Sequence, residues 1–270
     1  MLFNVKRHYY NVAEAFRGAA EYAQFRAGWP ELRKKAPKGD GHPVLVVPPF
    51  TGNDTVSAPL RNALTDMGYK AYGWEGGINL GLNDKKSQLL HERVEKIYKE
   101  NGRKKMTIIG LSLGGLYARE LAREFPDMVR DVISINTPFG IGLNRDAAPP
   151  LLVGTIQLLS GTEFSLKAEG MAERLITPPP VPTTSIFSKT DGIAGWEACL
   201  NPKSPKAENV EVNGCHIAGF WNLEALTVIL DRLAQPAGRW KPFKRTEHHS
   251  PAPDPGWKNR LAGKTQFFKR

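Results

Sequence analysis

The sequence predicts an α/β fold in which a mostly parallel sheet of about six strands carries helices on both faces. Short apolar runs alternate with longer amphipathic segments along most of the chain, which is typical of β-α-β units. Several of these runs are apolar at every position, as expected for parallel strands that are buried on both faces. The chain has 270 residues, 41% of them hydrophobic, which is enough to bury a core of this size.

The predicted elements follow one another in a regular order. A helix is expected over residues 9–27, where alanine and aromatic residues have roughly helical spacing, and Pro30 is expected to end it. The first strand covers residues 44–47 and is closed by Pro48 and Pro49. The later strands are expected near residues 70–72, 106–109, 129–135, 184–188 and 209–212, and the later helices near 58–67, 87–100, 116–125 and 222–233.

The alternation stops between residues 138 and 182, which contain an apolar segment and a helix-like piece around 166–175. We expect this region to be a small cap inserted into the fold rather than a second core. The predicted organisation is an N-terminal helical extension at 1–40, a central domain at 41–235 that includes the insertion, and a basic, aromatic tail at 236–270. Within the tail, Trp240 and Phe243 are expected to dock on the body of the protein.

Charge and composition exclude several classes of protein. The formal net charge is +10, but residues 1–40 carry eight Lys/Arg against four Asp/Glu, and residues 236–270 carry nine against two. No nucleic-acid-binding signature accompanies these basic ends, so no nucleic acid is expected as a partner, and a weak association with an anionic membrane surface stays open. The sequence has neither an apolar stretch of membrane-spanning length nor a secretory signal at residues 1–7, which predicts a cytoplasmic protein.

Residues 110–114 match the pattern G-x-S-x-G, and their context makes the match specific. The pattern directly follows an apolar strand and directly precedes a helix, as a nucleophile elbow requires. Ser112 would then occupy a strained turn, with glycines where the strand and helix backbones crowd together. The helix N-terminus would place backbone amides beside the serine oxygen. The alternative is an ordinary strand-to-helix turn with Ser112 as the helix N-cap.

A serine hydroxyl needs a base to become a nucleophile, and the base needs an acid that orients it. Of the six histidines, His216 lies in a loop directly after the last predicted strand, where it could reach Ser112. Asp191 follows the preceding strand in the equivalent loop, which gives the chain order Ser, Asp, His. Three other carboxyl groups are weaker candidates for the acid: Asp127, Asp131 and Glu197.

The negative charge that such a serine creates on a substrate oxygen needs two N–H donors. One is expected to be the N–H of Leu113, the residue after the serine. The other is expected from the loop after the first strand, where Phe50 is the first residue beyond the two prolines that has an N–H, with Thr51 as the fallback. This loop could instead be a turn that the prolines make rigid, without a catalytic part.

Four segments resemble bacterial lipases and esterases of the α/β-hydrolase superfamily: residues 43–52, 110–115, 185–196 and 211–219. The acid and histidine loops are especially similar to those of small lipases. The resemblance covers about residues 43–235 and implies the α/β-hydrolase fold, with Ser112, Asp191 and His216 as its catalytic triad. The sequence departs from the pattern where Pro48 and Pro49 replace a frequent His-Gly and where two leading strands are missing.

The expected function is hydrolysis of a small acyl ester through an acyl-enzyme on Ser112. Acyl transfer or thioester cleavage with the same triad is an alternative, because water and alcohols compete for the same acyl-enzyme. A non-enzymatic, hydrolase-like lipid-binding protein is a second alternative, which the intact Ser-Asp-His set disfavours. Apolar side chains of the insertion could line an acyl pocket or pack a lid helix on the body: Leu151, Leu152, Val153, Ile156, Leu158 and Leu159.

Neither a metal nor a cofactor is expected, because no cluster with metal-ligand spacing is visible in the sequence. The two cysteines, Cys199 and Cys215, bracket the last predicted strand. A disulfide between them would hold the histidine loop, whereas a cytosolic compartment favours free thiols, so both alternatives stay open.

Overall fold

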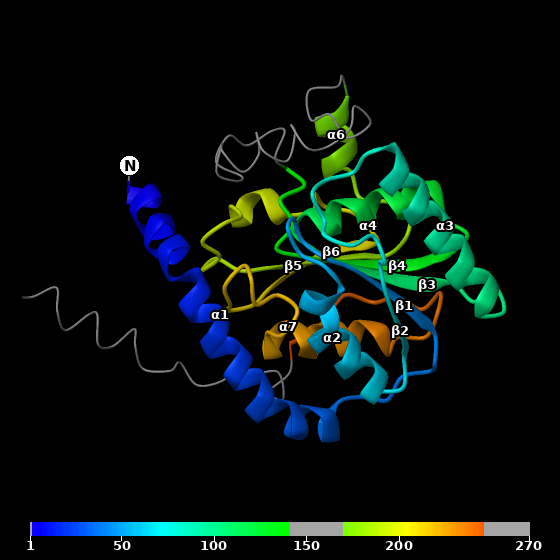
Figure 1. Ribbon diagram of the computed structural model, residues 1–270, viewed down its shortest axis with the longest axis horizontal. Coiled ribbons are helices and arrows are strands. Elements are labelled where there is room, and N and C mark those ends of the chain that lie inside the picture. Colours follow the sequence, from blue (N-terminus) through cyan, green and yellow to red (C-terminus); the bar gives the residue numbers. More distant parts are fainter. Residues whose placement is uncertain (1, 141–169, 246–270) are drawn as a thin grey trace, which may run out of the picture.

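The computed structural model describes residues 2–140 and 170–245. Within these ranges, six strands form one parallel sheet in the order β2-β1-β3-β4-β5-β6 (Figure 1). The strands are β1 (Pro43–Val47), β2 (Lys70–Gly73), β3 (Met106–Leu111), β4 (Val129–Ile135), β5 (Thr183–Phe187) and β6 (Ala207–Glu211). The predicted parallel sheet of about six strands is therefore confirmed.

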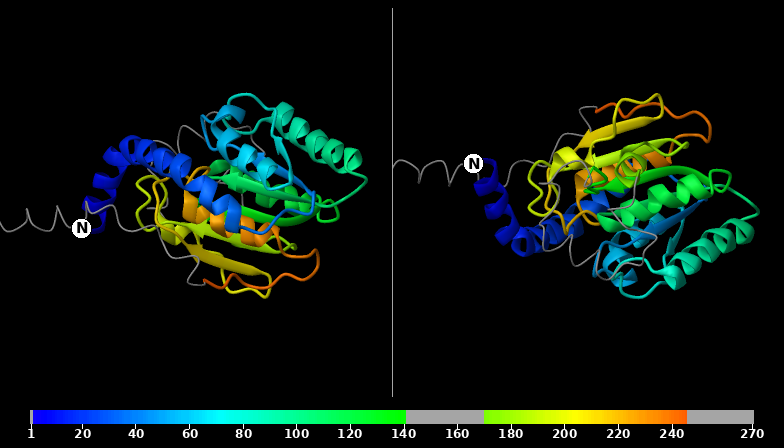
Figure 2. Two further views of the ribbon diagram at one scale, coloured as in Figure 1. Left: turned by 90° about the horizontal axis from the view of Figure 1, so that it is seen from below. Right: turned by 90° about the horizontal axis from the view of Figure 1, so that it is seen from above.

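Helices cover both faces of this sheet (Figure 1 and Figure 2). The long α1 (Leu2–Lys35), α2 (Asp54–Asp66) and α7 (Leu223–Leu233) pack on one face. On the other face lie α3 (Asp84–Glu100), α4 (Leu113–Glu124) and the short α6 (Met171–Ile176). A short 3-10 helix, η2 (Trp196–Cys199), follows β5. Each face of the sheet therefore has a large hydrophobic core among the described residues.

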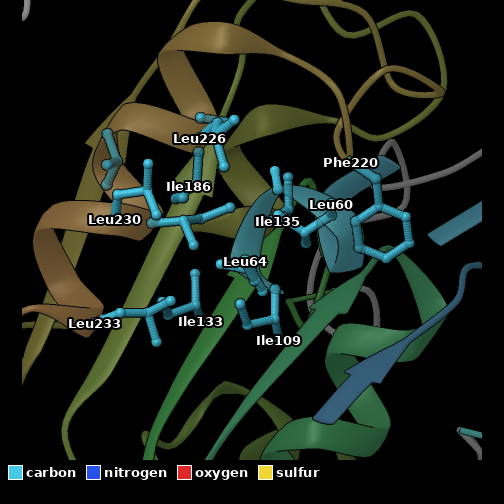
Figure 3. Close-up of a cluster of buried hydrophobic side chains, with 14 of the residues drawn as sticks. Leu60, Leu64, Ile109, Ile133, Ile135, Ile186, Phe220, Leu226, Leu230 and Leu233 are labelled. Atoms are coloured by element: carbon cyan, nitrogen blue, oxygen red, sulfur yellow. The ribbon is translucent and has the colours of Figure 1, made fainter. Parts of the chain in front are cut away.

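Strand β1 shows why the sequence contains fully apolar runs. Val44 and Val46 belong to the core under α2 and α7, whereas Leu45 and Val47 belong to the core under α3 and α4. Because successive side chains of a strand point to opposite faces, β1 buries apolar side chains on both faces of the sheet. Figure 3 shows labelled side chains of the first core: Leu60, Leu64, Ile109, Ile133, Ile135, Ile186, Phe220, Leu226, Leu230 and Leu233.

Helix α1 is longer than the sequence predicts, and the expectation that Pro30 ends it is wrong. The helix continues through Pro30 to Lys35. A proline inside a helix removes one N–H donor and costs about 3 kcal/mol. Packing offsets this cost, because Phe25 before the proline and Leu32 after it contact the same core on α7. The helix is therefore anchored on both sides of its weakest point.

The other predicted elements are present, and most helices begin earlier than expected. Helix α2 begins at Asp54 because the Asn53 side chain accepts hydrogen bonds from two N–H groups of its first turn. The Asn83 side chain caps α3 by accepting a hydrogen bond from one N–H group of its first turn. Helix α4 begins at Leu113, directly after Ser112, rather than near residue 116.

Parts of two predicted regions lie outside the described residues. These parts are residues 141–169 of the insertion, including the apolar segment around 151–159, and residues 246–270 of the tail. In the described part of the tail, Phe243 packs against the core beside α7, as predicted, and the Arg232 guanidinium lies 5.3 Å from its ring centroid. Trp240 is half-buried. No described helix combines the length and apolar character that crossing a membrane requires.

The docking of Phe243 leads to a stability prediction. Replacing Phe243 with alanine should lower the free energy of unfolding by about 1–2 kcal/mol, because the half-buried ring loses its contacts with the core. Chemical denaturation measures this difference. The exposed neighbour Lys244 supplies the control, since Lys244→Ala should change stability by less than about 0.5 kcal/mol. Equal stabilities of the two variants would contradict the docking.

Candidate active site

Ser112 occupies the turn between β3 and α4, at the carboxyl edge of the sheet. Its φ of 53° and ψ of −121° form a backbone conformation that residues other than glycine rarely adopt. The turn is this tight because the strand and the helix nearly touch: a Cβ on Gly110 would lie 2.2 Å from the Gly114 carbonyl oxygen. The Ser112 side chain makes no capping hydrogen bond to α4. The structure therefore has the strained strand-to-helix turn that the sequence predicts, without the N-cap interaction of the alternative.

The loop after β1 lies directly against the start of α4. A Cβ on Gly114 would lie 2.4 Å from the carbonyl oxygen of Val47, so any larger residue at this position would push the helix away. Phe50, further along the same loop, packs its half-buried ring against the core under α4. Leu113 is the first residue of α4, and N–H groups in the first turn of a helix have no partner within the helix. The two predicted oxyanion donors, Phe50 and Leu113, thus come from neighbouring segments.

Asn79 holds this loop in place and was not anticipated from the sequence. The Thr51 N–H donates to the backbone oxygen of Asn79 at 2.7 Å, so the fallback oxyanion donor is already engaged. The buried Asn79 side chain donates to Pro48 O at 2.9 Å. No sequence pattern marks this role, because a single asparagine in a glycine-rich loop is an ordinary turn residue.

Asp191 and His216 form a direct, buried contact. Asp191 lies in the loop after β5 and His216 in the loop after β6, and Nδ1 of His216 is 2.7 Å from Oδ2 of Asp191. The other carboxylate oxygen of Asp191 accepts hydrogen bonds from the N–H groups of Ile193 and Ala194, both at 2.7 Å. The carboxylate is therefore fixed by two backbone donors and directs its second oxygen at the imidazole. A carboxylate partner at Nδ1 places a proton on that nitrogen.

The histidine loop packs beside the serine turn. A Cβ on Gly219, three residues after His216, would lie 2.5 Å from Cδ1 of Leu111, the residue before Ser112. The Ser112 N–H donates to Ile135 O, at the end of β4, at 2.9 Å. The structure thus brings Asp191 and His216 into contact and places Ser112 at the same edge of the sheet.

The alternative acids lie elsewhere. Asp127 precedes β4 and is fully exposed, which places it at the amino edge of the sheet. Asp131 lies near the start of β4, where burial raises its pKa to about 6 although neighbouring arginines oppose the shift. Glu197 is exposed on η2. Of the four carboxyl groups considered, Asp191 is the one found in contact with His216.

A second histidine–aspartate pair occurs at the opposite edge of the sheet. His42 precedes β1, with its Nδ1 2.5 Å from Asp40 and its Nε2 3.1 Å from the Thr107 hydroxyl. Burial lowers the pKa of His42, and the nearby Arg130 cation lowers it further. Both ring nitrogens therefore have protein partners, which suits a structural role at the amino edge of the sheet.

The cysteines do not form the disulfide that the sequence left open. Cys199 and Cys215 are both buried and free. Burial raises the pKa of the Cys215 thiol well above its ordinary value, and the negative charges of Glu21 and Glu14 add to the rise. This thiol is therefore a poor nucleophile at neutral pH. The described residues contain no group of three or more His, Cys, Asp or Glu side chains arranged to hold a metal ion.

The position of α1 was also not anticipated from the sequence. Residues of this helix form hydrogen bonds with the loops that carry Asp191 and His216: Asn11, Glu14, Arg17 and Glu21. Their spacing of three and four residues is the one signal that could have indicated a common polar face.

Comparison with known proteins gives a short sequence match and a broad structural one. The sequence profile described as "Uncharacterised protein family (UPF0227)" matches residues 78–137, a stretch that includes Ser112. No curated protein sequence matches the chain.

Three of the similar solved structures, each with a TM-score above 0.5, illustrate the structural match. One comes from work on LipS and LipT, two metagenome-derived lipolytic enzymes, with 19% identity over 73% of this chain and 93% of that chain and a TM-score of 0.53. Another is the Paleococcus ferrophilus monoacylglycerol lipase, with 15% identity, 73% and 95% coverage, and a TM-score of 0.52. The third is Est1E from Butyrivibrio proteoclasticus, with 13% identity, 73% and 86% coverage, and a TM-score of 0.51. The chain therefore has the α/β-hydrolase fold.

Proposed function

We propose that the protein is a serine hydrolase that cleaves carboxylic esters through an acyl-enzyme on Ser112. The observation that carries the proposal is the buried contact between His216 Nδ1 and Asp191 Oδ2, at the edge of the sheet where Ser112 occupies its strained turn. The similarity of the fold to a monoacylglycerol lipase and to lipolytic enzymes supports ester chemistry.

The proposed reaction has two halves. The Ser112 Oγ attacks the ester carbonyl carbon while Nε2 of His216 takes the hydroxyl proton, and Asp191 stabilises the imidazolium. The N–H groups of Leu113 and Phe50 donate to the oxyanion of the tetrahedral intermediate. The carbon–oxygen bond to the alcohol then breaks, and the alcohol leaves with the proton from His216. In the second half, a water molecule attacks the acyl-enzyme and gives its proton to His216. The carboxylic acid is released and Ser112 is restored.

The cost of burying the acid and base favours a catalytic role over simple ligand binding. Asp191 and His216 side chains are 2% and 7% exposed, and two further backbone donors hold the acid. A binding protein has no use for an oriented imidazole at the same edge of the sheet as a strained serine.

Side chains near the loop that contains Phe50 favour an apolar acyl ester as substrate. Ile78 and Leu80 flank the buried Asn79, and they are 54% and 43% exposed, respectively. Exposed branched side chains next to a candidate site are suited to contacts with an alkyl group.

Loss of the serine hydroxyl tests the nucleophile. Ser112→Ala should lower kcat on a p-nitrophenyl ester by about 10⁴–10⁶-fold, because the variant lacks the hydroxyl on which the proposed acyl-enzyme forms. Circular dichroism checks that the variant is folded. Ser87→Ala, on α3, is the matched control and should keep wild-type activity. A folded Ser112→Ala variant with more than a few per cent of the activity would refute Ser112 as the nucleophile.

A pair of carboxyl-to-amide substitutions tests the acid. Asp191→Asn should lower kcat by about 10⁴-fold, because an amide at this position favours the wrong tautomer of His216. Glu197→Gln, in which the exposed carboxyl group on η2 is lost, should keep wild-type kcat. The opposite ranking of the two variants would identify Glu197 as the acid.

A further inference from the structure

The N-terminal helix α1 lies across the two loops that carry the proposed acid and base (Figure 1). The two loops are also tied to each other, because the Ser188 hydroxyl donates to Gly214 O at 2.7 Å. The residues of α1 that contact them lie on one face of the helix: Asn11, Glu14, Arg17, Gly18 and Glu21.

Glu14 makes the contact that joins both loops. Its Oε1 accepts a hydrogen bond from the N–H of Gly192 at 2.8 Å, and its Oε2 accepts one from the N–H of Ile217 at 3.2 Å. Gly192 immediately follows Asp191, and Ile217 immediately follows His216. One carboxylate thus holds the backbone next to the acid and the backbone next to the base.

The surroundings of Glu14 are built to keep a buried carboxylate in this position. Its side chain is 7% exposed, and Nη1 of Arg17 lies 3.6 Å from Oε1 and compensates the negative charge. Arg17 also donates to the backbone oxygen and the hydroxyl of Thr190, at 2.6 and 3.0 Å. The cation therefore fixes Glu14 and the acid loop together.

The acid loop approaches the helix backbone itself. A Cβ on Gly192 would lie 2.4 Å from the backbone nitrogen of Asn11, and the Asn11 side chain donates to Gly192 O at 3.1 Å. On the histidine side, Glu21 accepts from the Cys215 N–H at 2.8 Å. The helix therefore contacts the residue directly after the acid and the residues on both sides of His216.

Apolar burial does not explain why the half of α1 that includes residues 11–21 is docked on the two loops. On the outer face, Val12 and Phe16 are 74% and 87% exposed. Hydrogen bonds to loop backbone carry much of the contact in this half, whereas the half around Phe25 packs on the core. Polar contacts are directional, so they fix the geometry of the loops more closely than apolar packing does.

We propose that Glu14 is a positioning residue for the reaction, which sets the hydrogen bond between Asp191 and His216 from the N-terminal helix. The proposal rests on the proposed function, in which these two residues are the acid and the base. Glu14 does not touch the substrate. It acts by holding Gly192 and Ile217 at a fixed separation, and a misplacement of catalytic groups by about 1 Å can cost 100-fold in rate.

Glu14→Gln is the informative substitution. A carboxylate accepts hydrogen bonds at both oxygens, whereas an amide has one accepting oxygen and an NH₂ group that can only donate. The amide side chain of this variant would therefore hold one loop and present a donor to the N–H of the other. The size of the side chain is unchanged, so the substitution removes one anchor without leaving a cavity.

The kinetic experiment compares full-length wild type, Glu14→Gln and Glu31→Gln on a short p-nitrophenyl ester. Glu31 lies on the same helix, is exposed and pairs with Lys34, so Glu31→Gln is the matched control. We expect Glu14→Gln to lower kcat by about 10- to 100-fold, with KM within about twofold of wild type. Glu31→Gln should match wild type in both. A merely structural role would lower the active fraction and the melting temperature without a change in turnover per active site.

A spectroscopic experiment on the same proteins does not depend on turnover. The proton on Nδ1 of His216, in a short hydrogen bond to a carboxylate, should give a downfield imidazole N–H resonance in proton NMR. Glu14→Gln should shift or broaden this resonance, and Glu31→Gln should leave it unchanged. If wild type hydrolyses no ester but the resonance responds in this way, the proposed function fails, and only the influence of Glu14 on the hydrogen bond between Asp191 and His216 stands.

A folded Glu14→Gln variant with wild-type kcat and an unchanged imidazole resonance would overturn the inference. If that variant does not fold, Asn11→Ala supplies the test, because it removes one hydrogen bond between α1 and the acid loop. Asn11→Ala should lower kcat severalfold at unchanged KM and shift the same resonance. Wild-type values for both in this variant would equally overturn a positioning role for the helix.

Discussion

The close approach of α4 to the strands beneath it is the constraint on which the rest of the site depends. At Gly110 and Gly114 a Cβ would lie 2.2 and 2.4 Å from neighbouring backbone oxygens, so glycine alone allows the contact. With the helix starting directly at residue 113, the chain has a single residue in which to turn, and Ser112 takes a φ of 53°. The strain is offset by the two cores that the sheet and its helices form around the turn.

Once this turn is fixed, the other groups need only be brought to the same edge of the sheet. Parallel strands end together, so the loops after β5 and β6 supply Asp191 and His216 at the same edge of the sheet as the serine turn. Loops are the least constrained part of such a fold, and here they receive support from outside the sheet. Asn79 holds the loop of Phe50, and α1 holds the acid and histidine loops through Glu14.

The parts of this structure that the sequence predicts are those with local signals. Apolar runs mark the strands, and G-x-S-x-G between a strand and a helix marks the turn at Ser112. The parts that it does not predict depend on distant partners. Glu14 bonds to amides 178 and 203 residues away, and a backbone N–H leaves no pattern in the sequence. The prediction that Pro30 ends α1 was wrong for the same reason. The packing that stabilises the helix beyond Pro30 comes from α7, which is distant in the sequence.

Covalent labelling shows whether Ser112 is an activated nucleophile. The intact protein is treated with a fluorophosphonate, digested, and analysed by mass spectrometry. An activated serine displaces fluoride and forms a stable phosphonate ester, so we expect one adduct, on the peptide that contains Ser112. Absence of an adduct, or an adduct on another residue of a protein that hydrolyses esters, would contradict it.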